Sequence, residues 1–223
     1  MPVRILTIHF KGEIKPFEVS LFRGAVINSL EDRPLLFHDH TEEGFRYSYP
    51  LIQYKRLNGK AAIVCLGKGT EQIEELLYSN ISFLTLGSRR WDAEISGIDP
   101  KEFDLQVSDD LFKYHLQQWL PLNEDNFRKY SRMEGIVERI FFLEKILTGN
   151  ILSFAKGIGV HLDGQVTGRI TSLSEPYVAR AKGVRMACFN VDFQTNVTLP
   201  DNIGLGKHAS IGFGVVSRIR TKK

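Results

Sequence analysis

The sequence predicts an α+β fold built from two successive units, and three observations lead to this prediction. Segments of alternating hydrophobicity and segments with apolar residues at three- and four-residue spacing follow the order strand, helix, strand, strand, helix, strand over residues 1–100. A second series of such segments occupies residues 101–223. Near its end, a glycine-rich stretch stands where a last helix would be expected. We therefore expect one domain at 1–100 and another at 101–223.

The first half opens with a strand and a helix and continues with a hairpin. Residues 3–10 alternate and are rich in β-branched side chains, as in a strand, and residues 16–27 carry apolar residues at helical spacing. Two strand-like runs, 45–56 and 60–66, then flank Leu57-Asn58-Gly59. Because Asn-Gly readily takes the positive φ angles of a two-residue turn, it indicates a hairpin between these runs.

The first half closes with a second helix and a last strand. Residues 70–78 have acidic side chains early and a Leu-Leu pair late, as in a short amphipathic helix. Residues 81–98, broken by Gly87-Ser88, predict a further strand or hairpin. The resulting order, βαββαβ, is that of a ferredoxin-like (RRM-like) unit.

The second half begins again with a strand and a helix. Residues 105–107 and 111–119 are strand-like and end at Leu120-Pro121. Residues 123–154 look helical, with a break expected at Gly149-Asn150. The apolar stripe of this helix consists of Ile136, Ile140, Leu143, Ile146 and Leu147.

Three extended segments end the chain, at residues 165–174, 184–197 and 211–219. No amphipathic helix separates the last two of them. The sequence therefore predicts tandem ferredoxin-like units, the second with a glycine-rich loop in place of a full last helix.

Composition and the lack of targeting signals indicate a cytoplasmic protein. The sequence holds no run of about 18 or more uncharged apolar residues, so no membrane contact is expected. Its N-terminus lacks the apolar core and the cleavage site of a signal peptide. Cys65 and Cys188 each lie in an apolar strand-like run, where they predict neither a disulfide framework nor a zinc site.

Basic residues are concentrated in the last quarter of the chain. The net charge is only +3, but from Gly168 onward nine Lys and Arg stand against three Asp and Glu. A polyanionic partner of the C-terminal half is the natural inference, and a basic face that meets only solvent is the alternative. Arg169, Arg180 and Lys182 are the candidate contacts with a nucleic acid.

The glycine-rich stretch, residues 204–214, favours binding of a phosphate backbone. Its four glycines, Gly204, Gly206, Gly212 and Gly214, remove side chains so that backbone N–H groups can approach a phosphate. Lys207 adds charge, and His208 is a further candidate contact. The stretch is not a Walker A loop, because a strand rather than a helix follows it. The alternative is a purely structural turn beside a glycine-lined strand.

A histidine pair lies in the segment between the first helix and the second strand. His38 and His40 fall within three positions of each other, and Tyr47 follows. An imidazole with a pKa near ~6.5 can accept or donate a proton at neutral pH, and such transfer contributes about 10²–10⁴-fold to a rate. In metal-free RNA cleavage one histidine can deprotonate a 2′-hydroxyl while the other protonates the leaving 5′-oxygen. A His-x-His metal site and a plain polar loop are the alternatives.

The two ends of the chain together resemble one family. The stretch Gly-Leu-Gly-Lys-x-x-Ser-x-Gly-Phe-Gly-x-Val at 204–216 and the histidine segment after the first helix are similar to those of the CRISPR-associated endoribonucleases that process precursor CRISPR RNA. These enzymes form the sixth CRISPR-associated protein family, within the RAMP superfamily. The phrases at 21–25, 45–50 and 142–152 resemble its b-type branch.

The resemblance implies a metal-independent endoribonuclease that cuts within CRISPR repeats by 2′-hydroxyl attack and yields mature guide RNAs. By motif, its catalytic histidine pair and tyrosine fall on His38, His40 and Tyr47, and its RNA-binding loop falls on the glycine-rich stretch. It implies no cofactor and no metal. The implied partners are CRISPR repeat RNA and, by family analogy, a second copy of the chain and proteins of an effector complex. Many relatives also have an active-site lysine, for which this sequence offers no assigned equivalent.

Three other functions compete with this interpretation. A related subunit of the same fold could hold guide RNA without cutting it. A metal-dependent hydrolase could use His38 and His40 as ligands. An enzyme acting on a small phosphorylated metabolite could use the glycine-rich stretch.

Overall fold

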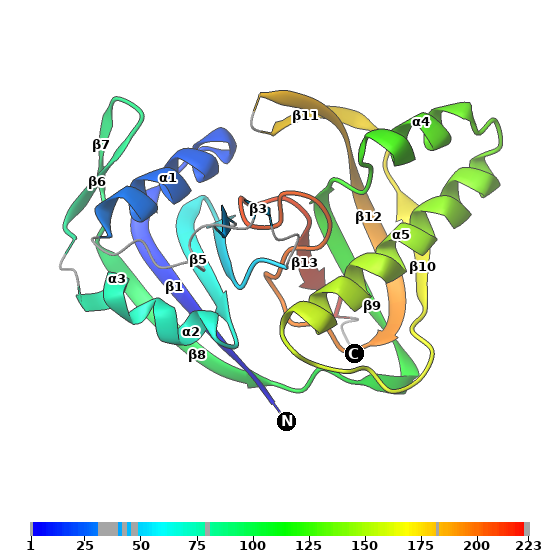
Figure 1. The fold of residues 1–223 in the computed structure, drawn as a ribbon, viewed down its shortest axis with the longest axis horizontal. Coiled ribbons are helices and arrows are strands. Elements are labelled where there is room, and N and C mark those ends of the chain that lie inside the picture. Colours follow the sequence, from blue (N-terminus) through cyan, green and yellow to red (C-terminus); the bar gives the residue numbers. More distant parts are fainter. Residues whose placement is uncertain are drawn as a thin grey trace. The chain divides into compact units, whose positions relative to one another are not determined.

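The computed structural model describes residues 2–30, 40–41, 44–45, 49–78, 81–181 and 183–220. The chain divides into two compact units. The first comprises Met1–Asp104 with Ser210–Gly212, and the second comprises Leu105–Ala209 with Phe213–Lys223. The elements of each unit are labelled in Figure 1.

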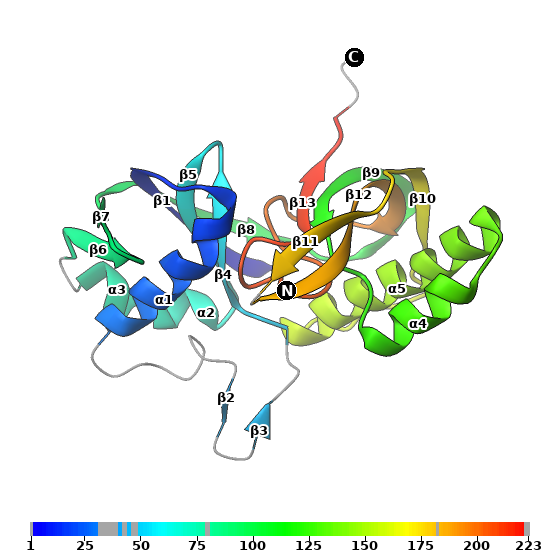
Figure 2. The same cartoon turned by 90° about the horizontal axis from the view of Figure 1, so that it is seen from above.

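A four-stranded antiparallel sheet forms the first unit, with strand order β4-β5-β1-β8. The helices of the unit lie over one face of this sheet (Figures 1 and 2). The elements are β1 (Val3–Glu13), the 3₁₀ helix η1 (Pro16–Glu18), α1 (Val19–Ser29), β2 (His40–Thr41), β3 (Gly44–Phe45), β4 (Ile52–Leu57), β5 (Lys60–Leu66), α2 (Gly69–Gln72), α3 (Glu74–Tyr78), β6 (Phe83–Leu86), β7 (Arg89–Asp92) and β8 (Ile95–Phe103). The predicted ferredoxin-like order is confirmed in this unit.

The predicted Asn-Gly hairpin is confirmed as well. β4 ends at Leu57 and β5 begins at Lys60. Between them Asn58 has φ 50° and Gly59 has φ 86°, which are the two positive values of a turn that matches the twist of the flanking strands. The strand expected from residue 45 onward begins only at Ile52.

Residues 81–98 form more than the single strand or hairpin expected. A separate hairpin, β6–β7, turns at Gly87-Ser88, and the last strand of the sheet is β8. The hairpin is anchored by Trp91, whose side chain is buried and whose indole N–H donates to the Glu13 carbonyl at 3.0 Å. The Trp91 ring packs edge-on against Phe22 of α1 at 5.3 Å between centroids, so the hairpin belongs to the core of the unit.

The second unit repeats the same strand order. Its sheet is antiparallel with order β10-β12-β9-β13, and β11 extends it by pairing with β12. The elements are β9 (Val107–Trp119), α4 (Glu124–Arg132), α5 (Ile136–Gly157), β10 (Gly168–Leu173), β11 (Tyr177–Ala181), β12 (Val184–Val197) and β13 (Val215–Arg218). No helix lies between β12 and β13 in the described residues 198–214, as the sequence predicts.

The expected helix break at Gly149-Asn150 is wrong. α5 runs unbroken through both residues, and the helical region is divided earlier, between Arg132 and Ile136. Packing explains the continuity, because the Asn150 side chain accepts a hydrogen bond from the Trp119 indole at 3.0 Å. The expected stripe is also shifted, since Ile136 is 60% exposed. The buried side chains of α5 are Leu143, Leu147, Ile151, Phe154 and Ala155.

The strand β11 has no counterpart in the sequence prediction. It pairs with the first five residues of β12 in a two-stranded ribbon that turns at Gly183, whose φ is 81°. Ala181 and Cys188 of the ribbon form a small buried cluster with Leu120, and Phe213 packs beside it. The ribbon is visible beside the sheet in Figure 2.

A lysine lies inside the first unit. The Lys55 side chain in β4 is 0% exposed. Because burial disfavours the charged form, it lowers the pKa of the Lys55 ammonium from 10.5 to about 7. Between these two pH values the unfolded chain carries a proton that the folded chain has released. The contribution of Lys55 to stability therefore rises with pH across this window.

The free energy of unfolding of the wild type is expected to rise relative to that of Lys55→Met as the pH rises from about 7 to about 10, because only the wild type has the ammonium group whose pKa burial lowers. Urea denaturation of both proteins over this pH range measures the difference. Lys60→Met, at an exposed position of the neighbouring strand, is the matched control. A difference that stayed constant with pH would contradict the burial argument.

Candidate RNA-processing site

The predicted catalytic residues fall in the part of the first unit that the structure describes least. His38 and Tyr47 lie outside the described residues. The backbone of His40 belongs to β2, which pairs with β3 through His40 opposite Phe45, and the His40 side chain lies outside the description. The catalytic role of the three residues therefore stays a prediction.

The glycine-rich stretch folds back on the second unit through backbone hydrogen bonds. The N–H groups of Leu205, Lys207 and Gly214 donate to the carbonyls of Gly214, Leu120 and Gln118, at 2.8, 3.1 and 2.9 Å. Gly204 forms an isolated antiparallel bridge with Val215. These three N–H groups are therefore used inside the protein, which differs from the expectation that the backbone of the stretch is free to face a phosphate.

The fold itself explains why three positions of the stretch are glycine. Gly206, Gly212 and Gly214 have φ angles of 88°, 89° and 62°, which disfavour any residue with a Cβ. A Cβ on Gly214 would stand 1.9 Å from the Leu205 carbonyl oxygen, and one on Gly206 would stand 2.8 Å from the Trp119 indole nitrogen. Close packing and positive φ thus account for these glycines without a ligand.

The side chains of Lys207 and His208 are the polar groups that the stretch presents. Both residues are partly exposed. His208 has φ 58°, and its ring lies 6.2 Å from the ring of Phe213. Phe213 in turn packs beside the β11–β12 ribbon. His208 and Phe213 therefore connect the stretch with the ribbon within the second unit.

The ribbon carries a pair of like charges that face each other. Arg180 of β11 is the register partner of Arg185 of β12, and both are exposed. Like charges directly opposite in an antiparallel pair repel each other. Within the described residues neither has a carboxylate within 4.0 Å. An anion bound between them would relieve this repulsion.

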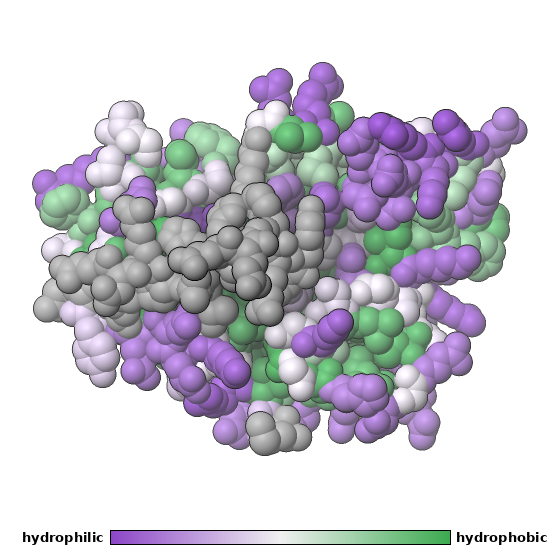
Figure 3. Space-filling view, viewed as in Figure 1, coloured by the Kyte–Doolittle hydropathy of each residue, from purple (hydrophilic) through white to green (hydrophobic). Residues whose placement is uncertain are grey.

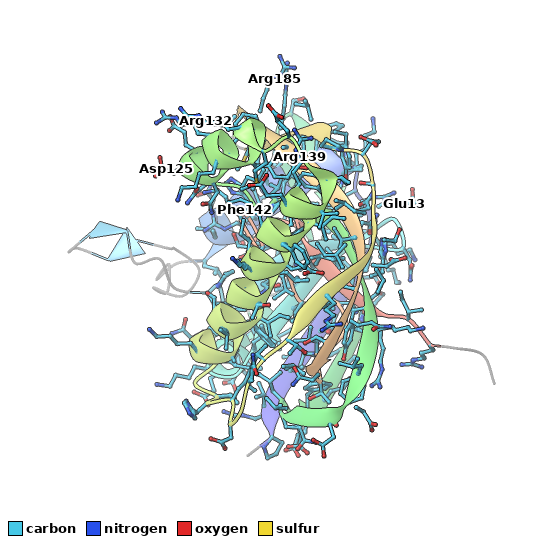
Figure 4. The ribbon with its side chains drawn as sticks, turned by 90° about the vertical axis from the view of Figure 1, so that its right-hand side faces the viewer. Glu13, Asp125, Arg132, Arg139, Phe142 and Arg185 are labelled. Atoms are coloured by element: carbon cyan, nitrogen blue, oxygen red, sulfur yellow. The ribbon has the colours of Figure 1, made fainter. Side chains whose placement is uncertain are left out.

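Further cations lie on the two helices of the second unit. Figure 4 shows Arg185 at its upper end, with Arg132 of α4 and Arg139 of α5 on the helices below. The Arg139 guanidinium lies 5.2 Å from the centroid of the Tyr130 ring and donates to the Met133 carbonyl at 2.9 Å. Figure 3 shows polar side chains over α4 and apolar ones over part of α5.

Another predicted basic contact, Arg169, lies on a different strand of the second unit. Arg169 is exposed on β10, where its register partner is Gln194. Lys182 lies outside the described residues. A separate hollow is lined by Lys113, Arg218 and Arg220 together with Leu111, Phe112 and Ile219. The basic excess of the C-terminal half is therefore spread over several places rather than gathered at one.

A histidine and a carboxylate that the sequence does not single out lie together in the second unit. On the sheet of the second unit, His115 Nδ1 and Asp192 Oδ1 are 2.6 Å apart, and each side chain is 39% exposed. Ser217 is the register partner of His115 on the other side, but no hydrogen bond joins the two. The residues lie on adjacent strands and far apart in sequence, so only the sheet register could have revealed the pair.

Clustered metal ligands and membrane-spanning helices are absent from the described part of the chain. Across the described ranges, no three His, Cys, Asp or Glu side chains converge as ligands of a metal ion. His38 lies outside the described residues, and the His-x-His alternative stays a prediction. No helix in the described part of the chain has both the length and the apolar character needed to span a membrane.

Comparison with known proteins gives consistent matches along the whole chain. An uncharacterized protein of Methanocaldococcus jannaschii is 32% identical over 114 residues, which are 51% of this chain and 76% of that protein. A crystal structure of Cas6b superposes with a TM-score of 0.90 at 25% identity and covers 98% of this chain and 100% of that one. A second structure, of the CRISPR RNA processing endoribonuclease Cas6b, has a TM-score of 0.76 at 23% identity with the same coverage, which supports the fold.

Family models divide the chain at the same place as the structure does. The model of the Cas6b N-terminal domain matches residues 1–104, and the model of the Cas6b C-terminal domain matches residues 106–219. The first unit likewise ends at Asp104 before the chain enters the second. The tandem ferredoxin-like fold and both domain matches show that the chain belongs to the Cas6b family.

Proposed function

We propose that the chain is an endoribonuclease that cleaves precursor CRISPR RNA within its repeats to give mature guide RNAs. The observation that carries this proposal is the match of both Cas6b domain models, over residues 1–104 and 106–219. A solved structure of the same fold is described as a CRISPR RNA processing endoribonuclease. The basic side chains of the second unit suit an RNA partner.

The proposed reaction is an internal transesterification that needs no metal. One histidine of the pair His38 and His40 removes the proton of a 2′-hydroxyl, and that oxygen attacks the neighbouring phosphorus. The bond from phosphorus to the 5′-oxygen breaks, and the other histidine protonates the leaving oxygen. Tyr47 orients a histidine or stabilises the phosphorane. The products are a 2′,3′-cyclic phosphate and a 5′-hydroxyl, and no water is consumed in the step.

The proposed RNA-binding surface combines the glycine-rich stretch with the ribbon. Lys207 and His208 are its contacts on the stretch. Gly206, Gly212 and Gly214 act by giving the stretch its shape, and Gly204 contributes through its bridge to Val215. Arg180 contributes on the ribbon, where Arg185 is its register partner. Lys182, at the turn of the ribbon in sequence, and Arg169 on β10 complete the surface.

Partners and location follow the same family analogy. A second copy of the chain and proteins of an effector complex are proposed as partners besides the RNA. The cytoplasm is the proposed location.

The double variant His38→Ala, His40→Ala is expected to lose cleavage of repeat RNA by a factor of about 10² or more, because both proton transfers are removed. Binding of the RNA should persist. Single-turnover cleavage in EDTA measures the rate, and electrophoretic mobility shift measures the affinity. His161→Ala is the matched control, since its side chain is 92% exposed.

Three outcomes separate the proposal from its rivals. A double variant that cuts as fast as wild type would refute the histidine mechanism. Activity that vanishes in EDTA and returns with Zn²⁺ or Mn²⁺ would favour a metal-dependent hydrolase. Tight binding by a wild-type protein that never cuts would favour a guide-RNA-binding subunit.

Lys207→Ala is expected to weaken RNA binding while leaving single-turnover cleavage at saturating protein largely intact. Losing one phosphate contact should make the plot of log affinity against log salt concentration shallower by roughly 0.7–0.9. The matched control is Lys156→Ala, an exposed lysine at the end of α5. Lost cleavage with unchanged binding would instead place Lys207 in the active site.

A further inference from the structure

The basic hollow of the second unit is built from two short chain segments. It has a volume of about 480 Å³, within the roughly 300–1,000 Å³ of ordinary ligand sites. One segment belongs to β9, and the other consists of the last residue of β13 and the two residues after it. The lining residues are Leu111, Phe112, Lys113, Arg218, Ile219 and Arg220.

Backbone hydrogen bonds hold the two segments in one arrangement. Arg218 is the register partner of Tyr114 on β9, and the Ile219 N–H donates to the Lys113 carbonyl at 2.9 Å. The Arg218 N–H donates to the Asp201 carboxylate at 2.6 Å. The backbone that carries the side chains of the hollow is therefore fixed by the fold itself, which lowers the entropy cost of binding a ligand there.

The three cations of the hollow are poorly neutralised by the described residues. Among these residues, no carboxylate oxygen lies within 4.0 Å of the Lys113 ammonium or the Arg218 guanidinium. Arg220 lies 3.9 Å from the Asp201 carboxylate, and its side chain is 83% exposed. Because an exposed ion pair of this kind contributes little, the hollow keeps a positive potential that attracts an anion.

Phe112 orients the Arg218 side chain without using its hydrogen-bond donors. The Arg218 guanidinium carbon lies over the Phe112 ring, 4.8 Å from its centroid. A guanidinium on an aromatic face is attracted to the ring through its charge, so its N–H groups stay available. No hydrogen bond to another described residue uses them. Arg218 is thus held in place and free to donate, as two-point binding of a phosphate requires.

Apolar side chains line the same hollow and indicate what the anion is attached to. Leu111 is 56% exposed and Ile219 is 39% exposed. A free phosphate ion gains nothing from such neighbours. A nucleotide of a single-stranded RNA offers both a phosphate for the cations and the faces of a ribose and a base for the apolar side chains.

We propose that this hollow is a second RNA-binding site, in which three cations hold the phosphate backbone while Leu111 and Ile219 contact a ribose or base. The cations are Lys113, Arg218 and Arg220. The site shares no residue with the RNA-binding surface proposed above. The inference rests on the proposed function for its ligand and adds a site to it. Because phosphate contacts carry no sequence information, the site should bind RNA with little preference for sequence.

The triple variant Lys113→Gln, Arg218→Gln, Arg220→Gln is expected to weaken binding of repeat RNA. Each lost phosphate contact of a single strand makes the plot of log affinity against log salt concentration shallower by roughly 0.7, so the triple should make it shallower by about 2. Fluorescence anisotropy over a series of salt concentrations measures both quantities. The labelled repeat RNA carries 2′-O-methyl groups, so it offers no attacking hydroxyl and is not consumed.

The matched control is a second triple, Lys129→Gln, Lys145→Gln, Lys156→Gln, which removes three exposed cations of α4 and α5. It changes the net charge by the same amount and should change the affinity and the salt dependence much less. Equal losses in the two triples would reveal only an effect of net charge and would overturn the site. An unchanged affinity in the first triple would also overturn it and would favour an acidic protein segment as the ligand.

Single variants keep the test decisive if the first triple fails to fold. Arg220→Gln, at a highly exposed side chain, should make the salt plot shallower by roughly 0.7, and an unchanged plot would overturn the site. Leu111→Ala should weaken binding by about threefold or more with an unchanged salt plot, because it removes apolar contact but no charge. An unchanged affinity in Leu111→Ala would overturn the assignment to a nucleotide.

The binding assay separates this inference from the proposed function, because the RNA in it cannot be cut by 2′-hydroxyl attack. A wild type that binds repeat RNA but never cuts it would refute the proposed function, and the comparison of the two triples would still decide on the hollow. A first triple that binds as tightly as wild type overturns the inference even if the wild type cuts repeat RNA.

Discussion

In the second unit the chain passes from β12 to β13 without a helix. The close approach of Gly214 to Leu205 makes this connection possible. A helix in that place would satisfy its own backbone groups and cover part of the sheet. In the glycine-rich stretch, backbone N–H groups instead donate to the carbonyls of Leu120, Gln118 and Gly214. Only residues without a Cβ fit at Gly206 and Gly214, so the glycine pattern is first a requirement of the fold.

Much of the fold could be predicted, because its signals are local. The Asn58-Gly59 turn specifies its own hairpin, and the missing last helix is visible as a lack of amphipathic spacing. The errors arose where distant contacts outweigh local preference. Gly149-Asn150 stays helical because Asn150 meets the Trp119 indole, and β11 is a strand because β12 extends past the sheet to pair with it. Neither partner is recognisable from sequence spacing.

The candidate site was predictable in residue type rather than in arrangement. The histidine pair and Lys207 stand out by sequence because their chemistry is unusual for their surroundings. Lys55 and the His115–Asp192 pair do not, since each looks like an ordinary strand residue until the burial and register are known. The glycines show the reverse case: the pattern was recognised, but its backbone N–H groups serve the protein rather than a free surface.

The tip of the glycine-rich stretch has a consequence for how the chain can be divided. β4 is an outer strand of the first sheet, and Ser210 and Ile211 supply its neighbour from more than 150 residues away. A fragment ending near Asp104 would therefore lack this neighbour of β4, and the exposed strand edge could pair with other chains. The two halves look modular in sequence, yet Tyr54 on the β4 edge of the N-terminal half meets a segment from the C-terminal end. If the gene were split at the domain boundary, the N-terminal fragment would be prone to aggregate through this strand edge and would not behave as an independent module.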